Sequence, residues 1–275
     1  MTVQTALQQG SRLLEEGSVP AARLTAEVLL SHALGRERVW LFGHPEEELG
    51  EVAWIHYGRS LHERLQGKPT QHITGRQEFY GREFLVTPDV LIPRPETEHV
   101  VETALERAPG AQRVADIGCG SGAIAVTLAL ELPSQVWATD ISIAALAVAA
   151  ENARRLRAGV HLVACDLASA LAADSFDLVA SNPPYVPLTK RAGLQREVRD
   201  WEPAVALFGG SSGTEFYGPL AAEAQRLLRP GGWLVFEIGF RAEETVRGLL
   251  AGWSELRVDP DLAGLPRVVS ACRRP

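Results

Sequence analysis

The residues with the clearest chemical character are Asn182-Pro183-Pro184-Tyr185, which directly follow the apolar run 176–181. Consecutive prolines stiffen the backbone and supply no N–H donors. Nearby carbonyl groups and the Asn182 side-chain oxygen are therefore free to accept hydrogen bonds from a planar NH₂ group. Two such acceptors would orient the nitrogen for in-line attack on an electrophilic methyl group, while the Tyr185 ring packs flat against it. A rigid loop with an Asn turn is the simpler alternative.

A second chemical feature is the glycine-rich run from Val114 to Ala123, which fits a strand, a loop and a helix start. Glycines let the backbone approach a ligand closely and adopt positive φ angles. The run satisfies the loose Gly-x-Gly-x-x-Ala pattern of dinucleotide-binding loops. Asp140 ends the next predicted strand, where a carboxylate can accept hydrogen bonds from both ribose hydroxyls. These features fit a nicotinamide dinucleotide or S-adenosylmethionine.

Two further carboxylates favour S-adenosylmethionine. Asp116 lies two residues before the first glycine, where it suits a cationic ligand and repels a pyrophosphate. Asp166 follows the third strand and can accept a hydrogen bond from the adenine amino group, with Leu167 beside the ring. Ligands of such sheets bind at the carboxyl ends of the strands, where these residues fall. The predicted cofactor site comprises Asp116, Gly118, Cys119, Gly120, Ser121, Gly122, Asp140, Asp166, Leu167 and Asn182.

The segment after Gly110 must position these residues, and its pattern alternates between strands and helices. This alternation predicts an α/β fold with a mostly parallel sheet covered on both faces. The last two strands have too short a connection for a helical crossover, which favours an antiparallel hairpin. Strands are predicted at Arg113–Ile117, Val136–Thr139, Val160–Ala164, Phe176–Ser181, Trp233–Ile238, Leu256–Val258 and Arg267–Cys272. Helices are predicted at Ala123–Leu130, Ile143–Leu156 and Glu215–Leu228.

The first 70 or so residues predict a helical bundle, with long helices at Ala21–Leu34 and Pro45–Gln66. Aromatic, β-rich sequence with turn signals then predicts a β-hairpin between Phe79 and Ile92. The stretch Pro93–Glu96 opens a helix toward Ala108 and is a candidate hinge over the cofactor. We therefore expect a helical domain at 1–75, a hairpin linker at 76–93 and a catalytic domain at 94–275.

Composition narrows the class of protein. The chain has 275 residues, 46% hydrophobic and 22% charged, as in average globular proteins. Cys119, Cys165 and Cys272 form no Cys-x-x-Cys pair, which argues against a zinc site or a disulfide framework. The most apolar window, Ile141–Ala150, is about half the length of a membrane span. The N-terminus shows no signal-peptide pattern, so we expect a soluble, cytoplasmic protein without a membrane partner.

Charge argues against a partner bound mainly through phosphates. The formal net charge is −7, and no run of Lys and Arg exceeds two residues. Because nucleic-acid binding usually depends on a basic patch, we expect no direct sequence-specific binding of nucleic acid.

These motifs together resemble a known family. Asn182-Pro183-Pro184-Tyr185 combined with this glycine loop resembles the class I S-adenosylmethionine methyltransferases that act on planar nitrogens. Further segments, in the same order and over essentially the whole chain, resemble the HemK-type release factor glutamine methyltransferases. Cys119 stands where that family commonly has Thr. The resembling segments are Thr70–Gly75, Glu78–Gly81, Leu91–Glu98, Asp116–Ala125 and Trp201–Gly210.

The resemblance implies a fold and a reaction. The fold would be a Rossmann-like methyltransferase domain, with an antiparallel C-terminal strand, plus a small helical domain that docks the substrate. The substrate would be the glutamine amide in the Gly-Gly-Gln tripeptide of class I peptide chain release factors. The products would be N5-methylglutamine and S-adenosylhomocysteine. The glutamine amide would bind at Asn182, Pro183, Pro184 and Tyr185, with Asn182, Pro183 and Tyr185 acting in catalysis.

No metal is expected in this chemistry, because the sulfonium already activates the methyl group. His56 and His62 lie six positions apart on a predicted helix, on nearly opposite faces, and so do not form a metal pair. Three alternatives stay open: a methyltransferase acting on nucleic-acid amines, a nicotinamide-dependent dehydrogenase, and a non-catalytic module that only binds the cofactor. A dehydrogenase would leave Asp166 and the Asn-Pro-Pro-Tyr tetrapeptide unexplained.

Overall fold

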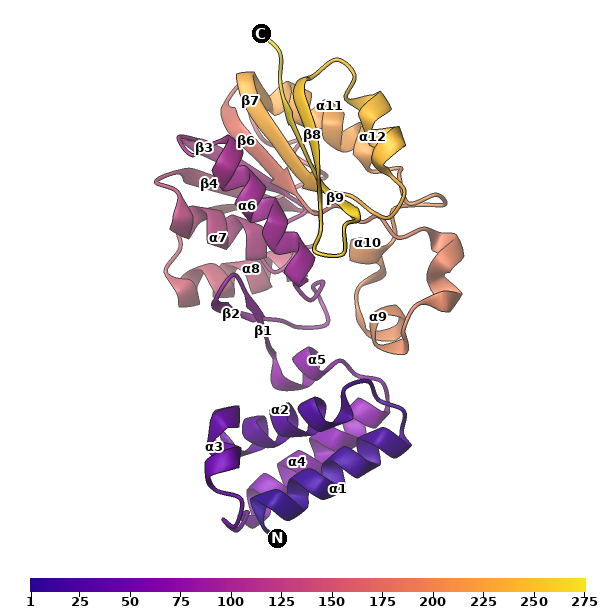
Figure 1. Cartoon of the computed structure of the whole chain (residues 1–275). Helices are drawn as coiled ribbons and strands as arrows, with labels where there is room; N and C mark the ends of the chain where they lie inside the picture. Colours follow the sequence, from indigo (N-terminus) through magenta and orange to yellow (C-terminus); the bar gives the residue numbers. More distant parts are fainter. The chain divides into compact units, whose positions relative to one another are not determined.

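The protein divides into two compact units in the computed structural model, which describes all residues from 1 to 275 (Figure 1). The first unit contains Met1–Arg76 together with Gln195–Trp201, and the second contains Gln77–Leu194 and Glu202–Pro275. The boundaries expected at residues 75 and 93 did not anticipate this insertion. A short segment far along the chain belongs to the N-terminal unit.

The first unit is a helical bundle, as predicted. Its core contains Leu14, Leu29, Leu30 and Tyr57, all of them fully buried. Amphipathic helices bury such residues by packing their apolar stripes together. The helices are α1 (Val3–Glu16), α2 (Ala22–Leu34), α3 (Arg38–Gly43), α4 (Glu51–Leu65), α5 (Thr70–Thr74) and α9 (Arg196–Trp201).

The helix predicted from Pro45 begins only at Glu51. Segment 45–49 instead covers the start of α1: the amides of Val3 and Gln4 donate to the carbonyls of Glu47 and Pro45, each at 2.9 Å. The first amides of a helix have no partner within it. The segment before α4 is therefore held in a non-helical conformation by hydrogen bonds to α1, which local periodicity does not reveal.

Helix α9 is held in the first unit by charged contacts. Arg64 on α4 forms an ion pair with Glu197, and only 8% of the Arg64 side chain is exposed. The Lys68 ammonium lies 6.0 Å from the centre of the Trp201 ring. A buried cation requires a partner, because an unpaired charge is costly to remove from water. The Arg64–Glu197 pair therefore ties α9 to the bundle.

The second unit is built on a seven-stranded sheet with the order β5-β4-β3-β6-β7-β9-β8. The first five strands in this order are parallel, and β9 runs antiparallel to both β7 and β8. The mostly parallel sheet and the antiparallel C-terminal hairpin are thus confirmed. The strands are β3 (Arg113–Ile117), β4 (Gln135–Asp140), β5 (Val160–Ala164), β6 (Phe176–Ser181), β7 (Leu228–Glu237), β8 (Ser254–Pro260) and β9 (Pro266–Cys272).

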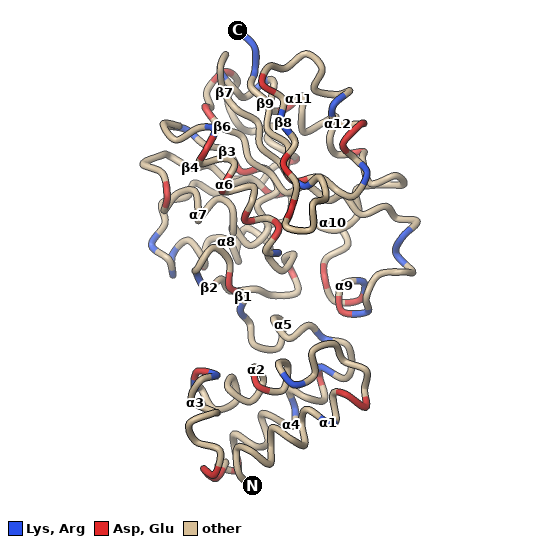
Figure 2. The backbone as a smooth tube through the Cα atoms, viewed as in Figure 1, with Lys and Arg blue, Asp and Glu red and all other residues tan.

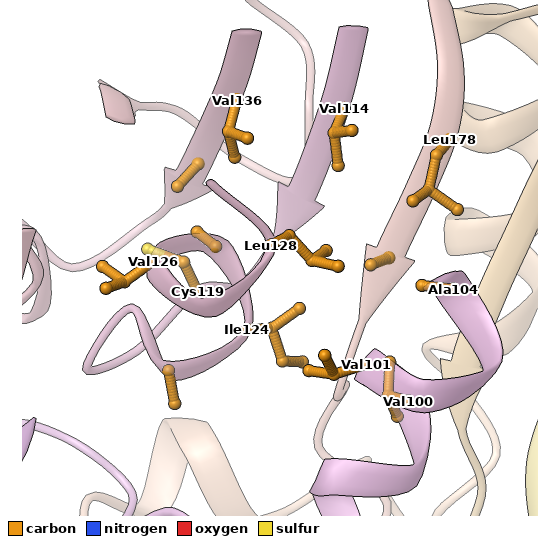
Figure 3. Close-up of a cluster of buried hydrophobic side chains, with 14 of the residues drawn as sticks. Val100, Val101, Ala104, Val114, Cys119, Ile124, Val126, Leu128, Val136 and Leu178 are labelled. Atoms are coloured by element: carbon orange, nitrogen blue, oxygen red, sulfur yellow. The ribbon is translucent and has the colours of Figure 1, made fainter. Parts of the chain in front are cut away.

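Two apolar clusters cover the opposite faces of this sheet. On one face, Val100 and Val101 of α6 (Glu98–Arg107) lie beside Ile124 of α7 (Ala123–Glu131), as Figure 3 shows. α8 (Ile143–Leu156) joins this cluster, while α11 (Tyr217–Leu227) and α12 (Glu243–Leu249) pack on the other face. No helix in the chain has the length and apolar character needed to cross a membrane.

The remaining elements are short. A two-stranded hairpin precedes the sheet, and several short helices lie near the ends of its strands. They are β1 (Arg76–Phe79), β2 (Arg82–Leu85), the 3₁₀ helices η1 (Pro95–Thr97) and η2 (Leu188–Gly193), and α10 (Ala204–Leu207).

Asn152 fastens this hairpin to the glycine loop. Its side chain is fully buried on α8. The Oδ1 atom accepts a hydrogen bond from the Leu85 amide at 2.7 Å, and Nδ2 donates to the carbonyls of Leu85 and Ser121 at 3.0 and 2.9 Å. One side chain therefore satisfies three backbone groups from two segments distant in sequence.

Replacing Asn152 with alanine should lower the free energy of unfolding by about 1–3 kcal/mol, because buried backbone groups would lose their partners. Chemical denaturation monitored by circular dichroism measures the change. Glu151→Ala, at the neighbouring solvent-facing position, serves as the matched control and should leave the unfolding midpoint little changed. Equal midpoints for the two variants would show that the Asn152 hydrogen bonds do not stabilise the fold.

Candidate active site

A cavity of about 220 Å³ opens at the carboxyl ends of β3, β4, β5 and β6. The sheet order reverses between β3 and β6, so the loops leaving these two strands diverge and leave a crevice. Most of the predicted site residues meet here, although they come from four different loops. The lining includes Gly118, Cys119, Gly120, Ser121, Asp140, Asp166, Leu167, Asn182, Pro183 and Pro184.

The glycine loop is held by the carboxylate of Asp140. One carboxylate oxygen accepts a hydrogen bond from the Gly120 amide at 2.9 Å, and the other accepts one from the Ser142 amide at 2.8 Å. Gly120 has a φ of +53°, a conformation that side chains disfavour. An ionised carboxylate has about four acceptor positions, so Asp140 can also accept hydrogen bonds from a ligand in the cavity.

Gly122 lies behind the loop and does not line the cavity. Its φ is +80°, and an added Cβ would lie 3.1 Å from the Cβ of Ala149 on α8. The glycine therefore allows α7 to begin close against α8. Its contribution to a ligand site is indirect, through the path of the loop.

Asp116 is also absent from the cavity wall, so its expected contact with a cationic ligand stays a prediction. Its side chain is fully buried beneath the loop. One carboxyl oxygen accepts a hydrogen bond from the Ala125 amide at 3.0 Å, in the first turn of α7, where helix amides lack partners. Burial, together with the nearby charge of Asp140, raises the pKa of Asp116 to about 7, although the hydrogen bond from the Ala125 amide acts in the opposite direction.

Asn182 reaches the cavity at the end of β6, and its amide group is part of a hydrogen-bonded chain. Nδ2 donates to Thr97 Oγ1 at 2.9 Å, and the Thr97 hydroxyl donates to Glu237 Oε2 at 2.6 Å. Glu237 ends β7 and is 1% exposed. The Tyr185 hydroxyl donates to the other oxygen of Glu237, at 2.8 Å. Sequence reasoning did not single out Thr97 or Glu237.

Tyr185 turns away from the cavity, although its neighbours in the tetrapeptide line it. An added Cβ at Gly239 would lie 2.9 Å from the Tyr185 ring, so the ring packs closely over that backbone. Burial and the nearby charge of Glu237 raise the pKa of the Tyr185 hydroxyl well above its usual range. The flat packing of this ring against a ligand therefore stays a prediction. Its hydroxyl belongs to the buried hydrogen-bonded network through its bond to Glu237.

Two glycines support the tetrapeptide from behind. An added Cβ at Gly209 would lie 2.4 Å from the Pro184 carbonyl oxygen, and one at Gly213 would lie 2.4 Å from the Tyr185 carbonyl oxygen. The Val186 amide donates to the Leu207 carbonyl at 2.9 Å. No other residue type allows backbone segments to approach this closely, so 207–213 fixes the loop that carries the prolines.

Glu202 fastens a further wall of the cavity. Its side chain is almost completely buried; it forms an ion pair with Arg94 and accepts a hydrogen bond from the Ile92 amide at 3.1 Å. Pro93, between these two residues, lines the cavity. The stretch predicted as a hinge is thus anchored by a buried carboxylate, and hinge motion stays a prediction.

Comparison with known proteins identifies the family. Residues 5–75 match the PrmC N-terminal domain, and residues 97–196 match the methyltransferase small domain. The release factor glutamine methyltransferase of Koribacter versatilis is 46% identical over 273 residues, covering 98% of both chains. The chain belongs to the release factor glutamine methyltransferase family. The enzyme of the same name from Moorella thermoacetica is 44% identical to this methyltransferase, covering 100% of this chain and 99% of the other.

Solved structures share the fold at much lower identity. A methyltransferase from Pyrococcus furiosus is 20% identical, covers 71% of this chain and 91% of its own, and superposes with a TM-score of 0.55. A Thermus thermophilus 16S rRNA N2 G1207 methyltransferase, solved with AdoMet and guanosine, is 20% identical, covers 72% and 50%, and has a TM-score of 0.51. These likenesses place this methyltransferase in the class I methyltransferase fold.

The buried carboxyl of Asp116 should make the stability of this methyltransferase depend on pH. Its pKa rises from 3.8 to about 7 on folding, so the folded protein holds a proton that the unfolded chain has released. The free energy of unfolding should therefore fall as the pH rises from about 4 to 7, by at most about 1.4 kcal/mol per pH unit from this group. Asp116→Asn should lack this contribution.

Denaturation of wild type and Asp116→Asn at several pH values measures the difference in slope. Asp174→Asn, at an exposed aspartate of the same unit, is the control and should keep the wild-type slope. Identical pH slopes for wild type and Asp116→Asn would contradict the burial of an ionisable carboxyl at this position.

Proposed function

We propose that this protein transfers a methyl group from S-adenosylmethionine to the glutamine amide in the Gly-Gly-Gln tripeptide of class I release factors. The products are N5-methylglutamine and S-adenosylhomocysteine. The observation that carries the proposal is the near-full-length identity to enzymes named release factor glutamine methyltransferase. A protein that modifies a translation factor would act in the cytoplasm.

The cavity suits S-adenosylmethionine. The exposed backbone of Gly118 to Ser121 would contact the ligand, and Asp140 would accept hydrogen bonds from the ribose hydroxyls. Asp166 and Leu167, at the end of β5, would bind the adenine. When bound, the cofactor supplies an electrophilic methyl group on a positively charged sulfur. Asp116 lies beneath the loop, so it would act through the position of α7.

The chain would contribute positioning and electrostatic stabilisation. Asn182 Oδ1 and the Pro183 carbonyl would accept hydrogen bonds from the glutamine NH₂ and hold its lone pair toward the methyl group. Positive charge grows on this nitrogen as it reacts, and the same two acceptors would stabilise that charge. The methylated nitrogen then loses a proton, which water can take.

Several features support a protein substrate over a nucleic acid. Basic and acidic residues are interspersed along both units, and no long stretch of the chain is only basic (Figure 2). The N-terminal unit, which we propose as the docking domain, exposes large apolar side chains on α3 and α4. Val39, Phe42, Val52 and Ile55 are 70%, 56%, 67% and 58% exposed. Exposed apolar side chains of this size can serve protein recognition.

Methyl transfer from labelled S-adenosylmethionine tests the proposal directly. The candidates are a class I release factor, the same factor with Gly-Gly-Gln changed to Gly-Gly-Ala, DNA and ribosomal RNA. We expect label on the intact factor and none on its variant. Label on nucleic acid alone would agree with the assigned fold and cofactor but would contradict the proposed substrate. Label on no candidate would contradict the proposed activity.

Replacing Asn182 with alanine should lower the rate of methyl transfer at least ~10²-fold, because one oriented acceptor is lost from the reacting site. S-adenosylmethionine should still bind, since the glycine loop and Asp140 are unchanged. Single-turnover kinetics and calorimetry measure the two effects separately. Near-normal turnover would remove Asn182 from the mechanism, whereas loss of cofactor binding would assign it to the cofactor site.

A further inference from the structure

We propose that Thr97 and Glu237 are positioning residues that orient the Asn182 amide so that its oxygen faces the substrate nitrogen. Neither residue was singled out by the sequence. Both belong to the buried series of hydrogen bonds that starts at the Asn182 amide. The inference deepens the proposed function and rests on it, because it assumes that the Asn182 oxygen accepts a hydrogen bond from a substrate NH₂.

The need for such positioning follows from the shape of an amide. The oxygen and the NH₂ of an Asn side chain have nearly the same size, so rotation by half a turn exchanges an acceptor for a donor in the same space. A donor facing the substrate NH₂ would repel it. Only one of the two orientations of Asn182 is therefore compatible with the proposed chemistry.

Thr97 selects that orientation because its hydroxyl has a single proton. Its Oγ1 lies 2.6 Å from Glu237 Oε2, and an ionised carboxylate only accepts hydrogen bonds. The hydroxyl proton is therefore committed to Glu237, and Oγ1 can only accept from Asn182 at 2.9 Å. An acceptor there requires the Asn182 NH₂, which leaves the amide oxygen on the opposite side.

Glu237 is in turn held between two donors. The hydroxyls of Thr97 and Tyr185 occupy its two oxygens, at 2.6 and 2.8 Å. Burial raises the pKa of the Glu237 carboxyl, and the charge of Glu96 acts in the same direction. Both hydroxyl donors and the nearby charge of Arg267 oppose this shift by favouring the ionised form. A carboxylate buried to 1% exposure is costly, so it stays ordered only when such partners satisfy it.

The sheet places these groups within reach of one another. Ser181 of β6 is in register with Phe236 of β7, so Asn182 and Glu237 follow adjacent positions on neighbouring parallel strands. Thr97 ends the 3₁₀ helix that begins at Pro95, is 4% exposed, and lies in the cavity wall. The hydrogen-bonded network is therefore fixed by two strands and the 3₁₀ helix η1.

The test is Thr97→Val, which keeps the side-chain shape but removes the hydroxyl, compared with Thr97→Ser, which keeps the hydroxyl. We expect Thr97→Val to lower kcat for release factor methylation at least about 10-fold, less than the loss of an aligned group itself. The dissociation constant of S-adenosylmethionine should change less than about 2-fold, because the glycine loop is unaltered. Thr97→Ser, which keeps the hydroxyl, should retain most of the wild-type kcat.

Thr127→Val is the matched control. Thr127 is also a fully buried threonine of this unit, but its hydroxyl has no hydrogen-bond partner. This variant should keep the wild-type kcat. If Thr97→Val and Thr127→Val have the same kcat, or if Thr97→Ser loses as much activity as Thr97→Val, the positioning role is overturned.

A double-mutant cycle separates action through Asn182 from a general structural effect. In the Asn182→Ala background there is no amide to orient, so Thr97→Val should lower kcat by less than about 2-fold. The same large loss in both backgrounds would contradict the proposal. If Thr97→Val does not fold, Glu237→Gln replaces it in the cycle. The hydroxyls of Thr97 and Tyr185 donate to different oxygens of Glu237, and the NH₂ that replaces one of these oxygens in Gln cannot accept a hydrogen bond.

Wild-type activity distinguishes a failure of the proposed function from a failure of the positioning role. Absence of methylation of the release factor by the wild-type enzyme would refute the proposed function. Wild-type methylation combined with unchanged kcat in Thr97→Val would refute the positioning role alone.

Discussion

The reversal of strand order between β3 and β6 is the constraint on which the rest of the second unit depends. Parallel strands require crossovers, and crossovers that leave in opposite directions open a crevice at the carboxyl end of the sheet. The glycine loop follows β3 and the Asn-Pro-Pro-Tyr tetrapeptide follows β6, so the two chemical motifs face one cavity. Their distance in sequence has no bearing on their proximity in the fold.

Buried polar side chains supply the order that the crevice requires. Loops at strand ends have few partners within the sheet, and their backbone groups must be satisfied by other means. Asp140 binds two amides near the cavity, Asn152 binds three backbone groups behind it, and Glu202 binds the Ile92 amide at its edge. Asp140 lines the cavity itself, whereas Asn152 and Glu202 hold its loops without lining it.

Much of the fold was predictable from the sequence, because apolar strands and amphipathic helices have strong local signals. β3, β5, β6 and α8 have the predicted bounds. The late start of α4 and the membership of α9 in the first unit were not predictable, since both depend on partners distant in sequence. Local periodicity carries no information about such contacts.

The residue types of the candidate site were predictable, but not which of them line the cavity and which lie buried behind it. A sequence places Asp116, Asp140 and Asp166 at strand ends, yet only the packing of α7 decides that the first is buried. Thr97 and Glu237 gave no signal by spacing, because they meet Asn182 only across strands. The strongest retrospective signal was the position of Thr97 within the segment Leu91–Glu98, which carries the family resemblance.

The insertion of Gln195–Trp201 into the first unit has a consequence for how such a protein can be divided or recombined. The backbone passes between the units three times, after Arg76, after Leu194 and after Trp201. A fragment that ends at Arg76 would lack Glu197 and leave the buried Arg64 without its ion-pair partner. The helical unit is therefore not contiguous in sequence, and a gene fusion that exchanges only the N-terminal segment would combine Arg64 of one parent with α9 of the other.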